Sequence, residues 1–344
     1  MVVNTVKLGG TASGITVAKV AHGLMRMGCD YRYAPSEEQA FESIKAGVDA
    51  LPPGVKMFLN SSEFYAPDLG TGNLEMLSRF YEKYPDYAEK TFLSVKGGTK
   101  PKSMVFDSSP ENLRRSIDTI NAALRGTKRV DLFETARVAP NVPVEEAVKT
   151  LVQLKNEGKF DHIGMSECRA ETLRKANAVH PIAAVEIEVS LWAYEEETKN
   201  VIATARELGI PVIAYSPLGK GLSTDTFKTR DELPEGDFRL RLAQFQEENL
   251  KANLAITEAL KGVAARKGIT PAQLSIAWVA SLGPHMIPLP GSSKASRTLE
   301  NLAAGDIELT QAELDEIADI MAKHEVKGER YFGGEANQML HLWG

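Results

Sequence analysis

The chain has 344 residues, with 40 Lys and Arg side chains against 46 Asp and Glu, which gives a formal net charge of −6. A hydrophobic fraction of 43% and a charged fraction of 25% are typical of a folded globular protein and exclude a disordered one. The acidic balance argues against nucleic acid as the main partner. The two cysteines, Cys29 and Cys168, exclude a disulfide scaffold and a four-cysteine zinc site.

The first residues lack a basic region followed by a longer apolar core, so we expect no signal peptide. We also expect no membrane partner, because the sequence has no uninterrupted apolar stretch long enough to cross a bilayer. The low cysteine count is typical of a reducing compartment, which favours a cytoplasmic location. No cluster of His, Cys and Asp has the spacing of metal ligands, so no metal is expected. Nothing in the sequence specifies an oligomeric state.

Two short β-rich runs, near residues 2–8 and 15–17, predict an N-terminal hairpin that turns after Gly9-Gly10. Strand and helix signals then alternate along the chain. We expect strands over residues 20–24, 57–59, 91–95, 130–133, 163–165, 183–189, 210–215 and 286–288. We expect helices over residues 36–50, 74–84, 109–124, 143–158, 170–180, 195–208, 250–267, 271–282, 296–304 and 311–323. Ser36 is a candidate N-cap, and Pro110 stands at a first helical position.

Eight strands separated by helices predict an α/β fold, a closed (β/α)8 TIM barrel with the N-terminal hairpin added. A doubly wound open sheet is the competitor, but its G-x-G-x-x-G turn is missing, because Gly23 and Gly28 do not make that pattern. Without a linker or low-complexity tract, residues 1–344 are expected to form a single domain. The extra length lies in residues 219–249 and in a C-terminal tail, residues 326–344, both candidate lids over the catalytic face.

Polar residues follow three apolar strands: the segment 60–65, Lys96 and Arg137. A lysine that continues an apolar strand either extends its ammonium to the rim or lies in the active-site mouth. Tyr65 on the neighbouring loop favours the second possibility. An ammonium beside a phenol stabilises the phenolate that remains after the phenol donates a proton.

With these residues the sequence resembles the aldo-keto reductase family over nearly its whole length. Residues 60–65 (Asn-Ser-Ser-Glu-Phe-Tyr) match the family's Asp-Thr-Ala-x-x-Tyr motif, and Lys96 matches its lysine. Residues 158–166, 214–222 and 287–301 resemble three further signatures. The resemblance implies that Tyr65 is the proton donor, Lys96 its partner, and Asn60 the residue at the catalytic aspartate's position.

The resemblance also implies NADP(H) as cofactor. The cofactor-binding residues it implies are Ser166, Glu186, Tyr215, Ser216, Leu218, Gly219, Gly221, Pro290, Gly291, Ser292, Lys294, Arg297, Glu300 and Asn301. A helix that opens near Ser296 offers backbone N–H groups to an anion, and Lys294 and Arg297 favour the extra phosphate of NADPH. The alternative is a capped surface helix with incidental charges. Tyr215 is either the ring that stacks on the nicotinamide or a half-buried core tyrosine.

Several positions depart from the family pattern. Asn60 replaces the aspartate, Ala136 stands where the catalytic histidine is usual, Glu167 replaces an asparagine and Glu186 a glutamine. This set resembles the fungal pyridoxal reductase branch. Asn60 can accept one hydrogen bond from Lys96 but gives it no charge, which leaves open whether Lys96 keeps its proton. Glu63 either helps to orient the substrate or the lysine, or is a loop residue that faces solvent or a backbone N–H, and we expect the second.

The residues and the resemblance favour an NADPH-dependent reductase of aldehydes, whose partner is a small-molecule substrate. The preferred reaction is the reduction of pyridoxal to pyridoxine. A second reading is an NADP(H)-binding regulatory protein, similar to the channel β-subunits of this fold. Loss of two catalytic positions favours it, and retention of Tyr65 and Lys96 counts against it. A glycosidase that pairs Glu186 with Glu188 leaves the phosphate-binding end unexplained.

Overall fold

The computed structural model describes residues 2–28 and 35–344, so Cys29 lies outside the described residues. Strands β1 (Thr5–Lys7) and β2 (Thr16–Ala18) pair antiparallel, which confirms the predicted hairpin. Val6 and Val17 of this hairpin pack with Phe58 and Phe92 in one buried cluster. The hairpin therefore covers one end of the barrel that the remaining strands form. Within the described part of the chain, no helix combines the length and apolarity that a bilayer-spanning segment requires.

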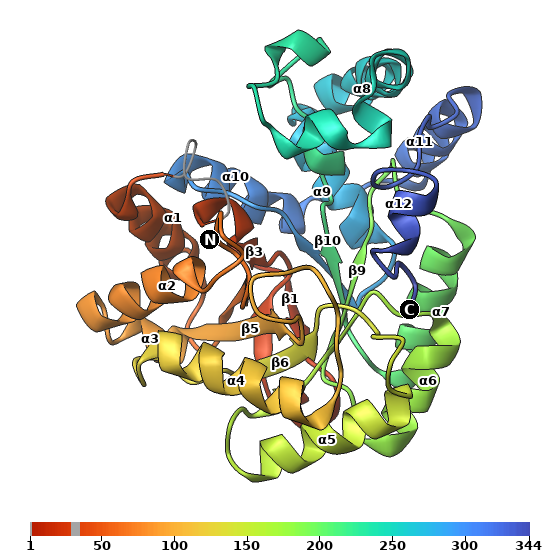
Figure 1. Cartoon of the computed structure of the whole chain (residues 1–344). Coiled ribbons are helices and arrows are strands. Elements are labelled where there is room, and N and C mark those ends of the chain that lie inside the picture. Colours follow the sequence, from red (N-terminus) through yellow and green to blue (C-terminus); the bar gives the residue numbers. More distant parts are fainter. Residues whose placement is uncertain (1, 29–34) are drawn as a thin grey trace.

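The remaining strands form a parallel barrel (Figure 1). They are β3 (His22–Gly23), β4 (Met57–Ser62), β5 (Thr91–Gly97), β6 (Leu132–Thr135), β7 (His162–Ile163), β8 (Met165–Ser166), β9 (Val185–Glu188), β10 (Val212–Tyr215) and β11 (Met286–Leu289). They pair in the orders β3-β4-β5-β6-β7 and β8-β9-β10-β11, and Gly164 alone separates β7 from β8. The sheet closes where the amides of Ala21 and Gly23 donate to Pro288 and Pro290 carbonyls at 2.9 and 3.0 Å.

Helices surround these strands, as the alternating pattern predicts (Figure 1). They are α1 (Glu37–Asp49), α2 (Gly72–Lys83), α3 (Tyr87–Lys90), α4 (Pro110–Leu124), α5 (Val144–Asn156), α6 (Ala170–Val179), α7 (Glu196–Leu208), α8 (Glu247–Lys267), α9 (Pro271–Ser281), α10 (Ala295–Ala303), α11 (Gln311–Lys323) and α12 (Glu335–Gln338). Ser36 caps α1 by accepting the Gln39 amide at 3.2 Å, and Pro110 opens α4. The short helices α3 and α12 were not predicted.

Alternate strand residues point into the barrel, because successive side chains of a strand face opposite sides. Phe58, Phe92 and Leu132 belong to the inner apolar cluster, whereas Leu59 and Leu93 belong to the outer core beneath the helices. Residues two positions beyond the inner apolar layer are polar: Asn60, Ser94 and Glu134. The barrel interior therefore changes from apolar to polar toward the carboxyl ends of its strands.

Gly164 makes room for this polar layer. A Cβ at this position would lie 2.6 Å from the Leu132 side chain and 3.0 Å from a carboxylate oxygen of Glu134. A methyl group there would displace one of these buried side chains. The glycine between β7 and β8 is therefore what allows Glu134 to occupy the barrel interior.

Candidate active site

Lys96, Asn60 and Glu186 form a closed ring of hydrogen bonds at the top of the barrel interior. The Lys96 ammonium donates to Oδ1 of Asn60 and to Oε1 of Glu186, the latter at 2.9 Å. The Asn60 amide nitrogen donates to Oε2 of Glu186 at 2.6 Å. The three side chains are buried and come from β5, β4 and β9. The predicted hydrogen bond from Lys96 to Asn60 is thus confirmed, and a carboxylate joins it.

This carboxylate answers whether Lys96 keeps its proton. Burial, the largest single effect, lowers the pKa of Lys96, but the charge and hydrogen bond of Glu186, together with Tyr65 and Glu134, outweigh burial and raise the pKa above its ordinary value. Burial and Glu186 also raise the pKa of Glu134 well above its usual range, while Lys96 opposes that rise. Lys96 is therefore favoured in its charged form, and Glu134 holds its proton more tightly than an ordinary glutamate does.

Tyr65 lies in the loop after β4, beside the lysine. The Lys96 Nζ is 5.3 Å from the centroid of the Tyr65 ring. On its other side the ring belongs to an apolar cluster, where it packs edge-on against Phe64 at 5.6 Å. The backbone N–H of Asn73 donates to the backbone carbonyl of Tyr65 at 3.2 Å and holds the loop in place. The phenol therefore has a positive charge on one side and an apolar wall on the other.

Ala136 is buried in the same apolar cluster, together with Phe106 and Ala139. It brings no hydrogen-bond donor to the position where the resemblance expects a histidine. The neighbouring Arg137 does not replace that donor, because its guanidinium lies over the Phe106 ring at 5.6 Å and donates to the carbonyls of Ala136 and Leu340. The wall beside Tyr65 is therefore apolar.

The expectation for Glu63 was wrong. Its carboxylate faces α4, where it forms an ion pair with Arg115 and accepts a hydrogen bond from Ser116 at 2.5 Å. The side chain is buried and faces neither solvent nor a backbone N–H. The ion pair instead fastens the loop that carries Tyr65 to a neighbouring helix.

Ser166 has an unsatisfied polar atom. It ends β8, is 1% exposed, and its hydroxyl finds no hydrogen-bond partner among the described residues. A buried hydroxyl without a hydrogen-bond partner destabilises the folded protein unless a ligand supplies that partner. Ser166 pairs in register with Glu186, so this hydroxyl belongs to the same mouth as the lysine cluster.

The segment after β10 has an unusual backbone. Ser216, Gly219 and Gly221 have positive φ angles of 53°, 56° and 106°, and Leu218 lies between them. A Cβ on Gly219 would lie 2.7 Å from the Trp192 ring, so the tight turn requires glycine there. This places Ser216 and the turn at the carboxyl end of β10, directly after Tyr215.

The junction between β11 and α10 carries two cationic side chains, Lys294 and Arg297. Pro290 and Gly291 run beside Gly23, and the buried Ser292 hydroxyl accepts the Lys294 amide at 3.2 Å. Lys294 and Arg297 are exposed at the start of α10 and have no carboxylate partner among the described residues. Their charges remain available to an anion at this helix N-terminus.

At two neighbouring positions, Glu300 and Asn301, the structure shows contacts or burial within the protein, and the cofactor role that the resemblance implies stays a prediction. The Glu300 carboxylate accepts a hydrogen bond from Thr270 at 2.7 Å and so braces α9. Asn301 is buried whereas Arg297 is exposed, although four residues separate them on one helix. Glu186 is likewise engaged by Lys96 and Asn60.

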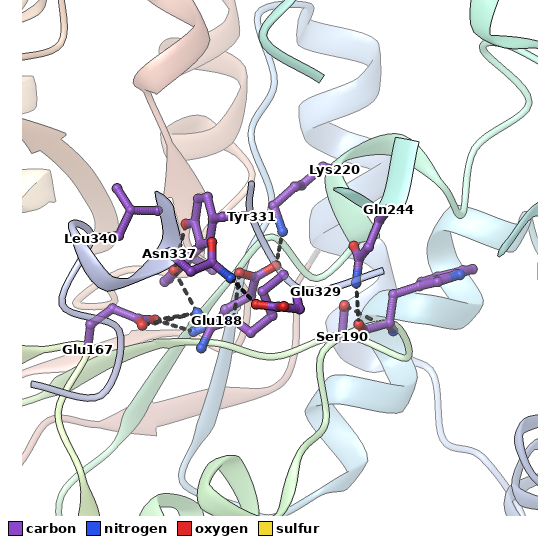
Figure 2. Close-up of polar contacts among 12 residues, drawn as sticks. Glu167, Glu188, Ser190, Lys220, Gln244, Glu329, Tyr331, Asn337 and Leu340 are labelled. Atoms are coloured by element: carbon purple, nitrogen blue, oxygen red, sulfur yellow. Dashed lines mark hydrogen bonds and ion pairs between the residues drawn. The ribbon is translucent and has the colours of Figure 1, made fainter. Parts of the chain in front are cut away.

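The C-terminal tail adds a cationic group that the sequence did not single out (Figure 2). Arg330 is 3% exposed and donates to both Glu167 oxygens at 2.9 and 3.0 Å and to Glu188 at 3.1 Å. It also donates to the Tyr215 hydroxyl at 3.2 Å, and Tyr331 shares a hydrogen bond with that hydroxyl at 2.9 Å. The tail is therefore bonded to the ends of β8, β9 and β10.

The charges of this second cluster fix its protonation. Burial would raise the pKa of Glu167, but Arg330 and then Arg137 outweigh it and lower the pKa below its usual value. Lys220 forms an ion pair with Oε1 of Glu188 (Figure 2), whereas Arg330 donates to its Oε2. Burial and, next, Glu188 raise the pKa of Tyr331 to about 12. The Glu167 carboxyl is thus favoured in its ionised form beside Arg330, and the tail phenol keeps its proton.

The parallel barrel brings a buried ammonium and an adjacent phenol together at its mouth, as the resemblance to a family of oxidoreductases implies. The family model described as the aldo/keto reductase family matches residues 19–322. The chain belongs to this family.

Relatives and a solved structure agree with this assignment. The chain is 34% identical to the probable pyridoxal reductase 2 of Schizosaccharomyces pombe, over 93% of this chain and 96% of that protein. It is 33% identical to aldo-keto reductase str7 of Strobilurus tenacellus (90% and 89% covered) and 31% identical to aldo-keto reductase yakc [NADP(+)] of S. pombe (94% of each). The structure of glycerol dehydrogenase AKR11B4 from Gluconobacter oxydans has the same fold, with a TM-score of 0.80 at 21% identity over 95% and 97% of the two chains.

Proposed function

We propose that the protein reduces aldehydes with NADPH, and that pyridoxal, reduced to pyridoxine, is its preferred substrate. The observation that supports this most strongly is the buried Lys96 ammonium beside the ring of Tyr65. Cofactor binding alone needs neither group. Family membership supports the reduction of aldehydes or ketones in general.

NADPH, when bound, supplies the hydride that reaches the carbonyl carbon. The Tyr65 hydroxyl donates its proton to the carbonyl oxygen, and the Lys96 ammonium stabilises the phenolate that remains. The orphaned Ser166 hydroxyl fits a polar group of the nicotinamide. Lys294 and Arg297 fit the additional phosphate that distinguishes NADPH from NADH. The resemblance implies that the turn at 216–221 and Gly291 contact the dinucleotide between these ends.

The surroundings of Tyr65 support a flat aromatic aldehyde. Phe64, Phe106, Ala136 and Ala139 make the neighbouring surface apolar, and alanine at the histidine position leaves room for a ring. The similarity to a probable pyridoxal reductase supports the same choice.

The test is an NADPH oxidation screen over pyridoxal and other aromatic and aliphatic aldehydes, applied to the wild type and to Tyr65→Phe. We expect Tyr65→Phe to lower turnover by about 10²–10⁴, the usual contribution of a general acid, with NADPH affinity nearly unchanged. Tyr81→Phe is the matched control. It removes a buried hydroxyl, bonded to Thr91 at 2.9 Å, outside the site and should keep turnover.

Lys96→Met should be as damaging as Tyr65→Phe, and the double variant little worse than either, because two groups that act as one unit are not additive. Near wild-type turnover of Tyr65→Phe, with chemistry shown to be rate-limiting, would refute the mechanism. A wild type that binds NADPH tightly but reduces none of the aldehydes would favour the regulatory protein instead.

A further inference from the structure

The ring of hydrogen bonds around Lys96 has a strict donor and acceptor pattern. Lys96 can only donate, and the Glu186 carboxylate can only accept. Asn60 does both, because its oxygen accepts from Lys96 and its nitrogen donates to Glu186. Against the family pattern set out above, the acid and the amide have exchanged positions. Residue 60 carries the amide and residue 186 the acid.

We propose that Glu186 is a positioning residue for proton donation: it supplies Lys96 with the negative charge that an aspartate at position 60 would otherwise supply. The exchange keeps one carboxylate beside the ammonium of Lys96. The carboxylate comes from position 186 on β9 and not from position 60 on β4. The catalytic part of this inference rests on the proposed function.

The geometry makes the two positions interdependent. With glutamine at 186 and asparagine at 60, an amide N–H of residue 186 would face either the Asn60 nitrogen or the Lys96 ammonium. With aspartate at 60 and glutamate at 186, two carboxylate oxygens would meet across the present 2.6 Å contact. Aspartate at 60 with glutamine at 186 reverses this one bond and satisfies all three partners again.

One other described carboxyl group, that of Glu134, lies near Lys96 and Glu186. The titratable groups that face Glu186 and Lys96 are Tyr65 and Glu134, and beyond Glu134 lies the Cys168 thiol, whose pKa burial raises. Glu134 accepts a hydrogen bond from Ser94 at 3.3 Å, and no hydrogen bond joins it to Lys96. If Glu186 lost its charge, an ionised Glu134 would sit near Lys96 without completing the ring.

The experiment is a reciprocal exchange in the full chain: Glu186→Gln, Asn60→Asp and the double variant. We measure kcat and KM for the aldehyde reduced best, NADPH affinity by fluorescence, and Tm without cofactor. Glu186→Gln should lower kcat by at least about tenfold with NADPH affinity within about threefold of wild type, since a bond to a charged group is lost. Adding Asn60→Asp should restore kcat to within about threefold of wild type.

Glu188→Gln is the matched control, because it makes the same chemical change two residues along β9, in the cluster of Arg330 and Lys220. Asn60→Asp should not rescue it. The proposal fails if Glu186→Gln keeps wild-type kcat, if the double variant is no better than Glu186→Gln, or if Glu186→Gln chiefly weakens NADPH binding. That last result would assign Glu186 to the cofactor instead.

Failure of the proposed function would give a different experimental result from failure of this inference. In that case the wild type reduces no aldehyde, and the Tm values alone test the pairing. Glu186→Gln should unfold at a lower temperature than the wild type, and the double variant should recover that loss. If the double variant unfolds at a temperature as low as that of Glu186→Gln, the reciprocal pairing is refuted as well.

Discussion

Arg330 is the residue whose replacement tests the architecture of the barrel mouth most directly. Arg330→Met keeps the length of the side chain and removes its donors. The variant loses bonds to Glu167, Glu188 and Tyr215. Lys220 still neutralises Glu188, but Glu167 keeps Arg137 only as a nearby charge. A buried carboxylate is therefore left without its hydrogen-bonded cation.

The magnitude follows from burial. Removing one partner of a buried ion pair costs about 3–5 kcal/mol, far more than an exposed pair. An unfolding entropy of about 2.1 cal/mol/K per residue, over 344 residues, is about 0.7 kcal/mol/K. The expected fall in Tm is therefore about 4–7 °C. If the tail detaches instead, water reaches Glu167 and the fall in Tm is smaller. In that case residues 326–344 become accessible to protease.

The assay combines thermal unfolding with limited proteolysis followed by mass spectrometry. Lys327→Ala is the control, because it removes an exposed ion pair with Glu325 in the same tail. It should change Tm by less than about 1 °C, as exposed pairs contribute about 0–1 kcal/mol. An Arg330→Met protein that unfolds within 1 °C of wild type, with its tail equally resistant to protease, would refute the reasoning.

Two further measurements probe other charges. Arg297→Ala should weaken NADPH binding at least about tenfold and leave NADH binding unchanged, because a charge-assisted contact contributes about 1.5–3 kcal/mol; equal losses for both nucleotides in a fluorescence titration would contradict the phosphate assignment. The folded-state pKa of Glu134 lies above its unfolded value, so its contribution to stability is full below that unfolded pKa and is lost as pH rises toward the folded pKa. Glu134→Gln removes this dependence, so the Tm of the variant relative to wild type should increase from pH 5 to pH 9; a constant difference would show that Glu134 is ionised.

The barrel could be predicted from sequence because its signals are local. Each strand and helix shows its own periodicity, and eight repeats of the pair leave few folds open. The contact between Lys96 and Asn60 could also be anticipated, since both residues end neighbouring strands. Glu63 was misjudged because its partner, Arg115, lies on a helix 52 residues further along, and no local pattern connects the two.

The carboxylates of β8 and β9 carried a signal that charge counting could have used. Glu167, Glu186 and Glu188 lie at the ends of strands that face the barrel interior, where each ionised carboxylate needs a cation. Lys96 can serve one of them. The other two require cations from loops, and the structure supplies them as Lys220 and Arg330. Local propensity could not identify Arg330, because it lies in a polar segment without regular periodicity.

Strand β9 divides the mouth into two units. Glu186 and Glu188, two residues apart, face the same side of the strand, yet one bonds Lys96 and the other bonds Arg330 and Lys220. Loss of Arg330 removes one of the hydrogen bonds of the Tyr215 hydroxyl, which keeps that to Tyr331, and leaves the ring of Lys96, Asn60 and Glu186 intact. Arg330→Met should therefore weaken NADPH binding more than it lowers kcat, whereas Glu186→Gln should do the reverse. Equal effects of both variants on both quantities would show that the two clusters act as one.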